Sequence, residues 1–206
     1  MSHRSSVSAP LSPAAGRLMF EASRRAEAMG LVAPEAAGPG AADLGAVRRL
    51  ASRIRQAGIA SAASAALHNV EAPEPAEVAE LLRTMIAALE ASPVPKFEWA
   101  GLGRVLDPER LSSLLEVSLS SLNRYQSGER DTPDAVAARL HFLALLVSDL
   151  AGSYNDIGIR RWFDRKRSAL GGRAPAQVLS GEWDPDDPGP SQVRALAREL
   201  VTFSAT

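Results

Sequence analysis

The sequence predicts an all-α protein, and three stretches carry that prediction. In residues 108–130, apolar residues recur three or four apart on both sides of a tight turn. Residues 136–150 repeat them at spacings of four, three, four and three, and residues 75–91 do so through Leu81, Met85 and Leu89. Such spacing places apolar side chains on one face of a helix. We therefore expect a helical bundle that ends in a small helical C-terminal domain.

Composition and net charge limit the classes of protein to which this chain can belong. The chain has 206 residues, of which 46% are hydrophobic and 23% charged, which suits one or two globular domains. The net charge of −1 excludes a bulk polyanion binder, so any contact with DNA requires a local basic patch. The absence of cysteine excludes disulfides and thiolate metal sites. Without a transmembrane-length apolar run or a signal-peptide core, we expect a cytoplasmic protein with no membrane partner.

The N-terminal part divides into a disordered segment, residues 1–13, and a helical region, residues 14–93. The first segment is rich in serine and proline. A helix is expected from Ala14 to Met29, followed by a linker over residues 30–40, which contain three glycines and two prolines. Asp43 is expected to cap a helix that runs to about Leu67.

In the rest of the helical region, prolines indicate where the helices begin and end. Pro75 can begin a helix, and Ser92 to Pro95 end it. A domain over residues 94–132 then begins with a short helix from Lys96 to Leu106, which places Trp99 in the core. Asp107 is expected to cap the next helix, which starts at Pro108.

Residues 108–130 predict two short helices joined by a tight turn. In the first helix Leu111, Leu114 and Leu115 face a core, and in the second Leu122 and Tyr125 do so. Ser118 is the expected N-cap of the second helix, and Gly128 its glycine terminator. This is the helix-turn-helix layout, in which the second helix enters the DNA major groove. The alternative is a solvent-facing helical hairpin with no role in DNA binding.

This stretch resembles the Xre or phage-repressor type of helix-turn-helix. The turn position that usually holds glycine in that family carries Glu116, which must tolerate a positive φ or reshape the turn. The residues that match the pattern are Leu111, Ser112, Leu115, Val117, Ser118, Ser121, Leu122, Arg124, Tyr125, Gly128 and Arg130.

The resemblance implies which side chains meet DNA. Leu119, Ser120 and Arg124 match its base-facing positions, and Arg124 can donate two hydrogen bonds to guanine. Leu119 can make only apolar contacts, for instance with a thymine methyl group. The full set expected at an operator in double-stranded DNA is Ser118, Leu119, Ser120, Ser121, Arg124 and Arg130.

The C-terminal domain, residues 133–206, begins with a long helix. Thr132 is its expected N-cap, with Pro133 in the first helical position. Its apolar stripe has heptad-like spacing, which suits either a helix buried within the chain or a dimer seam. Repressors of the resembled type bind paired half-sites, so we expect a homodimer. The stripe residues are Val136, Leu140, Leu143, Val147 and Leu150.

A second motif follows and resembles the MbcA/ParS-type toxin-binding domain of bacterial antitoxins. The resemblance implies a DNA-binding antitoxin of a type II toxin–antitoxin system, which represses its own promoter and neutralises a RES-domain toxin that consumes NAD. Two parts have no counterpart in the minimal antitoxins: the acidic, proline-rich stretch from Glu182 to Pro190, and residues 1–95. The matching residues are Arg161, Trp162, Phe163, Leu170, Gly171, Gly172, Pro175 and Leu179.

Basic and terminal residues are the candidates for partner binding. A run of six cations between Arg160 and Arg173 contains one counter-charge, Asp164, and can meet phosphate, an acidic partner or solvent. Ser191 is expected to cap a last helix that turns Leu196 and Leu200 inward. Phe203, placed beyond that helix, docks either on the toxin or on its own domain. The partner-binding set is Arg161, Arg165, Arg167, Arg173 and Phe203.

Catalytic and metal-binding patterns have little support. Asp184, Asp186 and Asp187 lack the spacing of a calcium loop, the histidines are scattered, and GLGRVL lacks the third glycine of a phosphate loop. We expect neither an enzyme nor a cofactor. The alternative to an antitoxin is a stand-alone transcription regulator whose C-terminal domain mediates dimerisation. A weaker third hypothesis is an enzyme or ligand sensor in the N-terminal helices.

Overall fold

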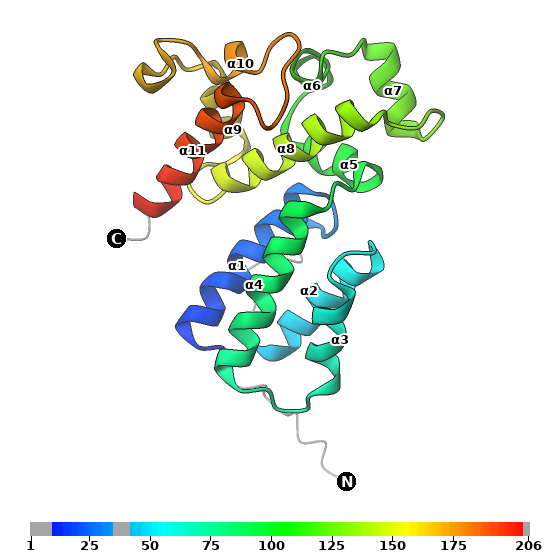
Figure 1. The fold of residues 1–206 in the computed structure, drawn as a ribbon, viewed down its shortest axis with the longest axis vertical. Helices are drawn as coiled ribbons and strands as arrows, with labels where there is room; N and C mark the ends of the chain where they lie inside the picture. The colour runs from blue at the N-terminus through cyan, green and yellow to red at the C-terminus, as the bar shows by residue number, and fades with distance from the viewer. Residues whose placement is uncertain (1–9, 35–41, 204–206) are drawn as a thin grey trace. The chain divides into compact units, whose positions relative to one another are not determined.

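A computed structural model describes residues 10–34 and 42–203, with side chains up to residue 200. Figure 1 shows helices joined by loops, and over the described ranges the only extended pairing is an isolated bridge between Pro10 and Asp43. The all-α prediction is confirmed. Residues 1–9 of the segment expected to be disordered, and residues 35–40 of the expected linker, lie outside this description. Within the described ranges, no helix is long and apolar enough to cross a bilayer.

The chain forms two compact units. Unit 1 comprises residues 1–26 and 32–92, and unit 2 comprises residues 27–31 and 93–206. The expected domains 94–132 and 133–206 therefore fall within one compact unit. The short segment 27–31, which no sequence pattern separates from its neighbours, belongs to the same unit.

The described part of unit 1 contains four α-helices, of which the first is α1 (Pro13–Ala28), whose last two residues are assigned to unit 2. The others are α2 (Leu44–Gln56), α3 (Ser61–Asn69) and α4 (Pro75–Ala91), and α3 packs against both α2 and α4. Arg25 on α1 pairs with Glu90 on α4, with 3.0 Å between Nη2 and Oε1. The buried apolar residues of unit 1 include Ala22, Val47, Leu50, Ile54, Leu67, Leu82, Met85 and Leu89.

The helix expected from Asp43 to Leu67 is two helices, α2 and α3. Asp43 does cap α2, since its Oδ1 accepts a hydrogen bond from the Ala46 amide at 2.7 Å. Gly58 and Ala60 then take left-handed backbone angles (φ 84° and 50°), which ends α2 and reverses the chain. The buried Ser64 hydroxyl donates to the Ala51 carbonyl at 2.8 Å, so α3 folds back on α2 instead of continuing it.

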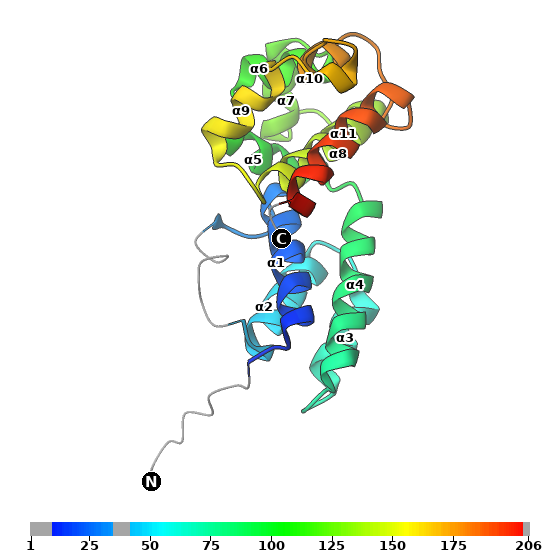
Figure 2. The same ribbon diagram turned by 90° about the vertical axis from the view of Figure 1, so that its left-hand side faces the viewer.

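Unit 2 is organised around one long helix, α8 (Asp134–Leu150). The helices packed against it are α5 (Pro95–Val105), α6 (Pro108–Leu115) and α11 (Pro188–Phe203). Every residue from Leu140 to Leu150 is buried, which is what a helix apolar on all sides requires. The remaining elements are α7 (Leu119–Ser127), α9 (Asp156–Asp164), the 3₁₀ turn η2 (Ser168–Leu170) and α10 (Pro175–Val178); Figure 2 shows them from a second side.

Burial settles the choice left open for the heptad-like stripe. Leu140, Leu143, Val147 and Leu150 are covered within a single chain, and Val136 is half-buried. The buried-helix alternative is therefore the observed one. The stripe is not available as a dimer seam, so any homodimer must use another surface.

Two helix starts differ from expectation. Thr132 does not cap α8, which has Pro133 at the N-cap, because the Thr132 hydroxyl accepts a hydrogen bond from Trp99 Nε1 at 3.0 Å. The last helix, α11, begins at Pro188, and the Ser191 amide already donates to the Asp187 carbonyl at 3.1 Å within its first turn. At its other end α11 includes Phe203, which was expected beyond the helix; the Phe203 side chain lies outside the described residues.

A close backbone crossing attaches segment 27–31 to α5. A Cβ atom on Gly101 would lie 2.2 Å from the Ala28 carbonyl oxygen, and one on Gly30 would lie 2.2 Å from the Phe97 carbonyl oxygen. Arg104 also donates from Nη2 to the Glu27 carbonyl at 2.8 Å. Gly101, the first glycine of the GLG sequence, thus serves packing, because only glycine allows two backbones to approach so closely.

The acidic stretch 182–190 is anchored by Trp183. The indole is buried, packs edge-on against Phe142 with ring centroids 5.3 Å apart, and donates to the Leu114 carbonyl at 2.9 Å. Arg139 lies over the Trp183 ring and donates to the Trp183 carbonyl at 2.7 Å. The carboxylates of Asp184 and Asp187 remain exposed and accept hydrogen bonds from the amides of the same loop. The stretch is an acidic loop fixed by one buried aromatic ring.

Candidate nucleic-acid interface

The turn between α6 and α7 accommodates glutamate where glycine was expected. Glu116 takes φ 55° and ψ 46°, the left-handed conformation that the sequence required of it. Ser112 supports this turn on both sides: its hydroxyl donates to the Val117 carbonyl at 2.6 Å, and its carbonyl accepts from the Val117 amide at 3.1 Å. Asp107 caps α6 as predicted, since it accepts from the Arg110 amide at 2.8 Å. Hydrogen bonds thus fix both ends of α6: the Asp107 cap at its start and the Ser112–Val117 contacts at the turn that follows it.

Helix α7 begins and ends at the capping residues predicted for it, Ser118 and Gly128. The Ser118 hydroxyl accepts from the Ser121 amide at 3.1 Å and lies 3.0 Å from the Ser121 hydroxyl, so both serines are engaged in capping. Gly128 ends the helix with φ 73°. Leu122 and Tyr125 are buried, and Tyr125 stacks on Trp99 with ring centroids 6.0 Å apart. These contacts orient the opposite face of α7 outward.

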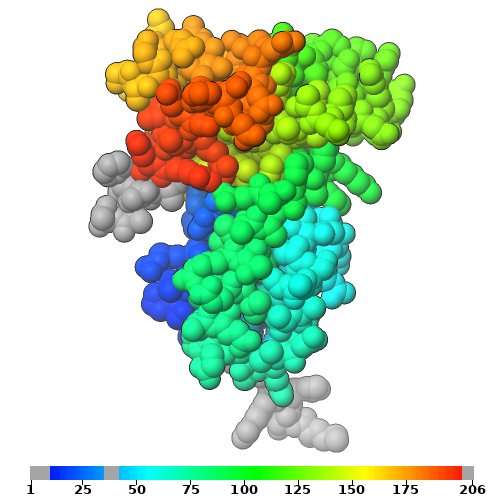
Figure 3. Space-filling view, viewed as in Figure 1, coloured from blue at the N-terminus to red at the C-terminus, as the bar shows by residue number. Residues whose placement is uncertain are grey.

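That outward face carries the predicted base-contacting residues. Leu119 is 43% exposed although it is a large apolar side chain, and Ser120 and Arg124 are exposed beside it. The structure adds Asn123, which is exposed one turn after Leu119 and which the sequence reasoning missed. Its i+4 spacing from Leu119 was the available signal. Asparagine matters here because it can form two hydrogen bonds with adenine. Figure 3 shows the residues around α7 on the molecular surface, in yellow-green.

Arg130 belongs to a different part of the hairpin. Its guanidinium lies over the Tyr125 ring, 5.7 Å from the centroid, and its amide donates to the Arg124 carbonyl at 3.1 Å. The six predicted DNA-binding residues therefore separate into three groups. Leu119, Ser120 and Arg124 share the outward face, Ser118 and Ser121 cap the helix, and Arg130 follows its C-terminal end.

Asp164, the one carboxylate in the cationic segment between Arg160 and Arg173, pairs with an arginine of α6. Arg110 binds Asp164 through two hydrogen bonds of 2.8 and 3.0 Å, and this contact raises the pKa of Arg110. Arg160 donates to the Val105 carbonyl at 2.8 Å. The exposed cations are then Arg161, Arg165, Lys166 and Arg173. The charge available for a partner lies on these four side chains.

Other residues of the second motif build the core of unit 2. Trp162 and Phe163 are buried edge to face, with centroids 5.7 Å apart, and Arg167 lies over the Trp162 ring at 5.4 Å. Arg167, predicted to bind a partner, is half-buried and held in that position. Gly171 and Gly172 reverse the chain with φ 64° and 80°. Pro175 begins α10, and Leu170, Pro175 and Leu179 are buried.

The last helix, α11, buries a narrower strip than expected. Val193 and Ala197 are fully covered, whereas Leu196 and Leu200, predicted to face inward, are half-buried. Arg194 and Arg198 each approach Oδ2 of Asp149 on α8, at 3.2 and 3.4 Å. These contacts join α11 to the central helix.

Behind the hairpin, unit 2 buries a charged residue that sequence reasoning missed. Glu98 on α5 has no exposed surface, and its Oε1 lies 2.5 Å from Nδ1 of His141 on α8. His141 is buried as well. No local sequence pattern pairs these residues, which are 43 positions apart. The pair joins the helix before the hairpin to the central helix.

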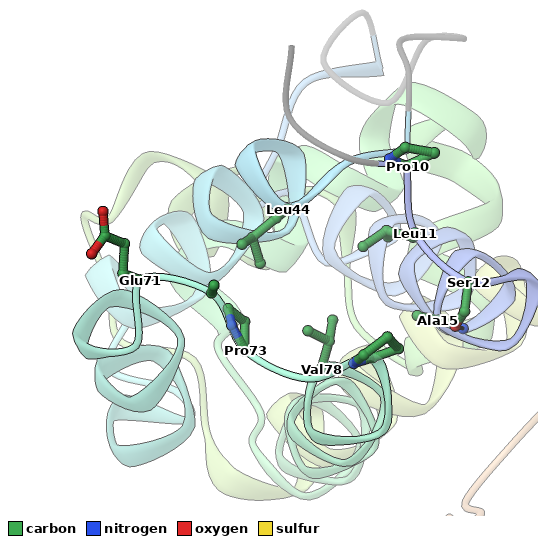
Figure 4. Close-up of a pocket in the computed structure, with 10 residues that line it drawn as sticks. Pro10, Leu11, Ser12, Ala15, Leu44, Glu71, Pro73 and Val78 are labelled. Atoms are coloured by element: carbon green, nitrogen blue, oxygen red, sulfur yellow. Dashed lines mark hydrogen bonds between the residues drawn. The ribbon is translucent and has the colours of Figure 1, made fainter. Parts of the chain in front are cut away.

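Unit 1 contains a hollow whose lining has few polar groups. Its volume is about 320 Å³, near the lower end of the range for ligand sites. Figure 4 shows its walls, in which Leu11, Leu44, Pro73 and Val78 supply apolar surface and Glu71 is the one charged lining residue. Glu71 is exposed at the rim. The hollow therefore lacks the convergent polar groups that would fix the orientation of a ligand.

Comparisons with protein-family models, with curated proteins and with solved structures found no match to this chain. The two family resemblances therefore rest on the motif residues themselves.

Proposed function

We propose that the protein is a DNA-binding antitoxin that reads an operator through α7 and represses transcription from it. The observation that carries the proposal is the outward face of α7, formed by Leu119, Ser120, Asn123 and Arg124. Capping and burial fix this face, on which a leucine that can contact a thymine methyl group lies beside polar side chains that can form hydrogen bonds with base edges.

A dimer is part of the proposal. One hairpin buries too little surface for tight specific binding, and paired readers fit half-sites about 34–36 Å apart. Because α8 is covered within the chain, the C-terminal helices are the remaining candidate surface, and the half-buried Leu196 and Leu200 of α11 supply apolar area for it.

The toxin-neutralising role rests on the resemblance of residues 161–179 to antitoxin domains. The exposed Arg161, Arg165 and Arg173 provide a cationic surface on the same unit as the reader. The proposed partner is a RES-domain toxin.

A second function, a stand-alone regulator, is favoured by one observation. The stretch 182–190, which departs from the antitoxin pattern, is bound to α6 through Trp183. The segment that departs from the antitoxin pattern thus packs on α6, the helix that precedes the proposed recognition helix.

The reader is tested by Arg124→Ala. We expect the variant to lose about 1–3 kcal/mol of discrimination at one base pair of each half-site, because a bidentate contact with guanine is removed. Affinity for operator and for single-base variants is measured at fixed salt. The control is Arg83→Ala, an exposed arginine of α4 that pairs with Glu80. Undiminished sequence preference in Arg124→Ala would remove the assignment.

The two functions are separated by a partner experiment. If the protein is an antitoxin, the product of a neighbouring gene copurifies with it and is toxic alone. Substitution of Arg161, Arg165 and Arg173 by glutamine should then weaken neutralisation while operator binding persists. If no neighbouring product binds and the purified protein still represses its operator, the regulator is the correct function.

A further inference from the structure

Helix α2 of unit 1 concentrates positive charge. Between Leu44 and Val70 the sequence contains four arginines, all on α2, and no carboxylate. Acidic side chains that neutralise such a surface are absent from this hairpin of α2 and α3, which contributes the cyan surface in Figure 3. The excess is therefore local, although the whole chain carries a charge of only −1.

The four arginines differ in what they contact. Arg48 points to the end of α3 and donates to the carbonyls of Leu67 and Val70, at 2.9 and 2.5 Å, so its charge serves the fold. Arg49, Arg53 and Arg55 are exposed, and none of them forms an ion pair within 4 Å among the described residues. Arg49 and Arg53 are four residues apart and share one side of α2, whereas Arg55 lies about 160° from Arg53 around the helix axis. We call the side chains of Arg49 and Arg53 the α2 arginine face. Gln56 is exposed beside them and adds an uncharged hydrogen-bond donor.

The apolar side of α2 limits what can bind this face. Val47, Leu50, Ala51 and Ile54 are buried, and α2 packs against α3. An interfacial amphipathic helix inserts its apolar side into the membrane, and the apolar side of α2 is buried against its own unit. The α2 arginine face thus presents charge and hydrogen-bond donors without an apolar anchor.

The stretch of unit 2 around the proposed reader carries more negative than positive charge. Residues 107–131, which contain the proposed reader, carry five carboxylates and three arginines. One of those arginines, Arg110, is bound to Asp164. Contacts with phosphates supply a large part of the affinity of proteins for DNA, and residues 107–131 are poor in the cations that make them.

We propose that the α2 arginine face is a second DNA contact, which binds backbone phosphates without sequence preference. Guanidinium groups are the side chains that suit phosphate best. Arg49 and Arg53 are one helical turn apart, about 6 Å along the axis, which is comparable to two nucleotide steps of about 3.4 Å on one strand. The inference rests on the proposed DNA-binding function and adds the source of its affinity.

The test measures how DNA affinity depends on salt, in full-length protein. The probes are a pool of random-sequence duplexes and the duplex bound best within that pool. We expect the double variant Arg49→Gln and Arg53→Gln to bind both probes more weakly. The slope of log K against log[salt] should become shallower by about 0.9 for each arginine that contacts a phosphate. The ratio of affinities for the two probes should stay the same.

Two controls separate charge from folding. Arg83→Gln removes an exposed arginine of the same unit that already pairs with Glu80, and it should leave the slope unchanged. The double lysine variant at positions 49 and 53 keeps the charge and should retain most of the slope. If the double glutamine variant unfolds, Arg53→Gln alone gives the same test with a smaller change.

The outcomes distinguish this inference from the proposed function. If the wild type prefers the selected duplex and the glutamine variants keep its full salt slope, the α2 arginine face does not bind DNA and an acidic protein is the better partner. If the wild type prefers no duplex over the random pool, the proposed reader fails. In that case a shallower slope in the variants would still support the phosphate contact.

Discussion

The indole nitrogen of Trp183 donates a hydrogen bond to the carbonyl oxygen of Leu114, at 2.9 Å, across 69 positions of sequence. Leu114 lies in the last turn of α6, where carbonyl groups have no partner within the helix. Arg139 extends the contact, since it donates to the neighbouring Leu115 carbonyl at 3.4 Å. The loop before α11 and the central helix thus cap the helix that leads into the proposed reader.

Loss of that hydrogen bond should destabilise unit 2. Trp183→Phe keeps most of the ring but leaves the buried Leu114 carbonyl unpaired, which costs about 1–3 kcal/mol. Urea denaturation followed by circular dichroism measures the difference. Trp99→Phe is the matched control: it also removes an indole donor, but its acceptor, the Thr132 hydroxyl, is half-buried and can turn to water. The prediction fails if Trp183→Phe costs no more than the control.

Which features the sequence could predict depends on the range of the interactions that determine them. The caps at Asp43, Asp107 and Ser118, and the glycine terminator Gly128, follow from chemistry within four residues of each helix end. The outward face of α7 follows from the same local rules. These features were predictable because no distant residue competes for the groups involved.

The failures arise where a distant residue does compete or approach. Thr132 has the form of an N-cap, but Trp99 uses its hydroxyl. Glu98 and His141 pair across the core, and Arg110 binds Asp164 from another helix. No periodicity encodes such contacts, because each depends on how helices far apart in sequence pack together.

Within residues 10–34 and 42–203, two residues other than glycine take left-handed backbone angles, and glycine should stabilise both positions. Glu116 (φ 55°) joins α6 to α7, and Ala60 (φ 50°) precedes α3. The left-handed conformation costs a residue with a Cβ about 1–2 kcal/mol, which exceeds the entropic cost of glycine in the unfolded chain. Glu116→Gly and Ala60→Gly should each raise the free energy of unfolding by up to about 1 kcal/mol. Glu116→Val, a β-branched control, should lower it. A destabilising Glu116→Gly would contradict the assigned turn.

Glu27 should make stability depend on pH. Burial raises its pKa above the ordinary value, Arg104 opposes that shift, and Asp156 adds to it. The folded state then holds the Glu27 proton more tightly than the unfolded state does, so this residue's contribution to stability falls as pH rises through the ordinary glutamate range towards the raised pKa. Urea denaturation at several pH values should show Glu27→Gln gaining stability relative to wild type as pH rises. Glu129→Gln, an exposed carboxylate of the same unit, controls for the loss of one negative charge. A constant difference between Glu27→Gln and wild type would contradict the prediction.

Two glycines of α5 should respond in opposite ways to substitution by alanine, because segment 27–31 crosses α5 at Gly101 and not at Gly103. A Cβ on Gly101 would lie 2.2 Å from the Ala28 carbonyl oxygen and 2.6 Å from the Gly30 amide nitrogen, and backbone atoms cannot turn aside as a side chain can. Gly101→Ala should therefore destabilise unit 2 by about 1–3 kcal/mol or more. A Cβ on Gly103 would meet only the end of the Gln126 side chain, at 3.9 Å. Gly103→Ala should stabilise the helix by about 0.5–1 kcal/mol, because alanine loses less backbone entropy on folding. Denaturation curves of the two variants should move in opposite directions, and a shift of both in the same direction would show that segment 27–31 does not cross α5 at Gly101.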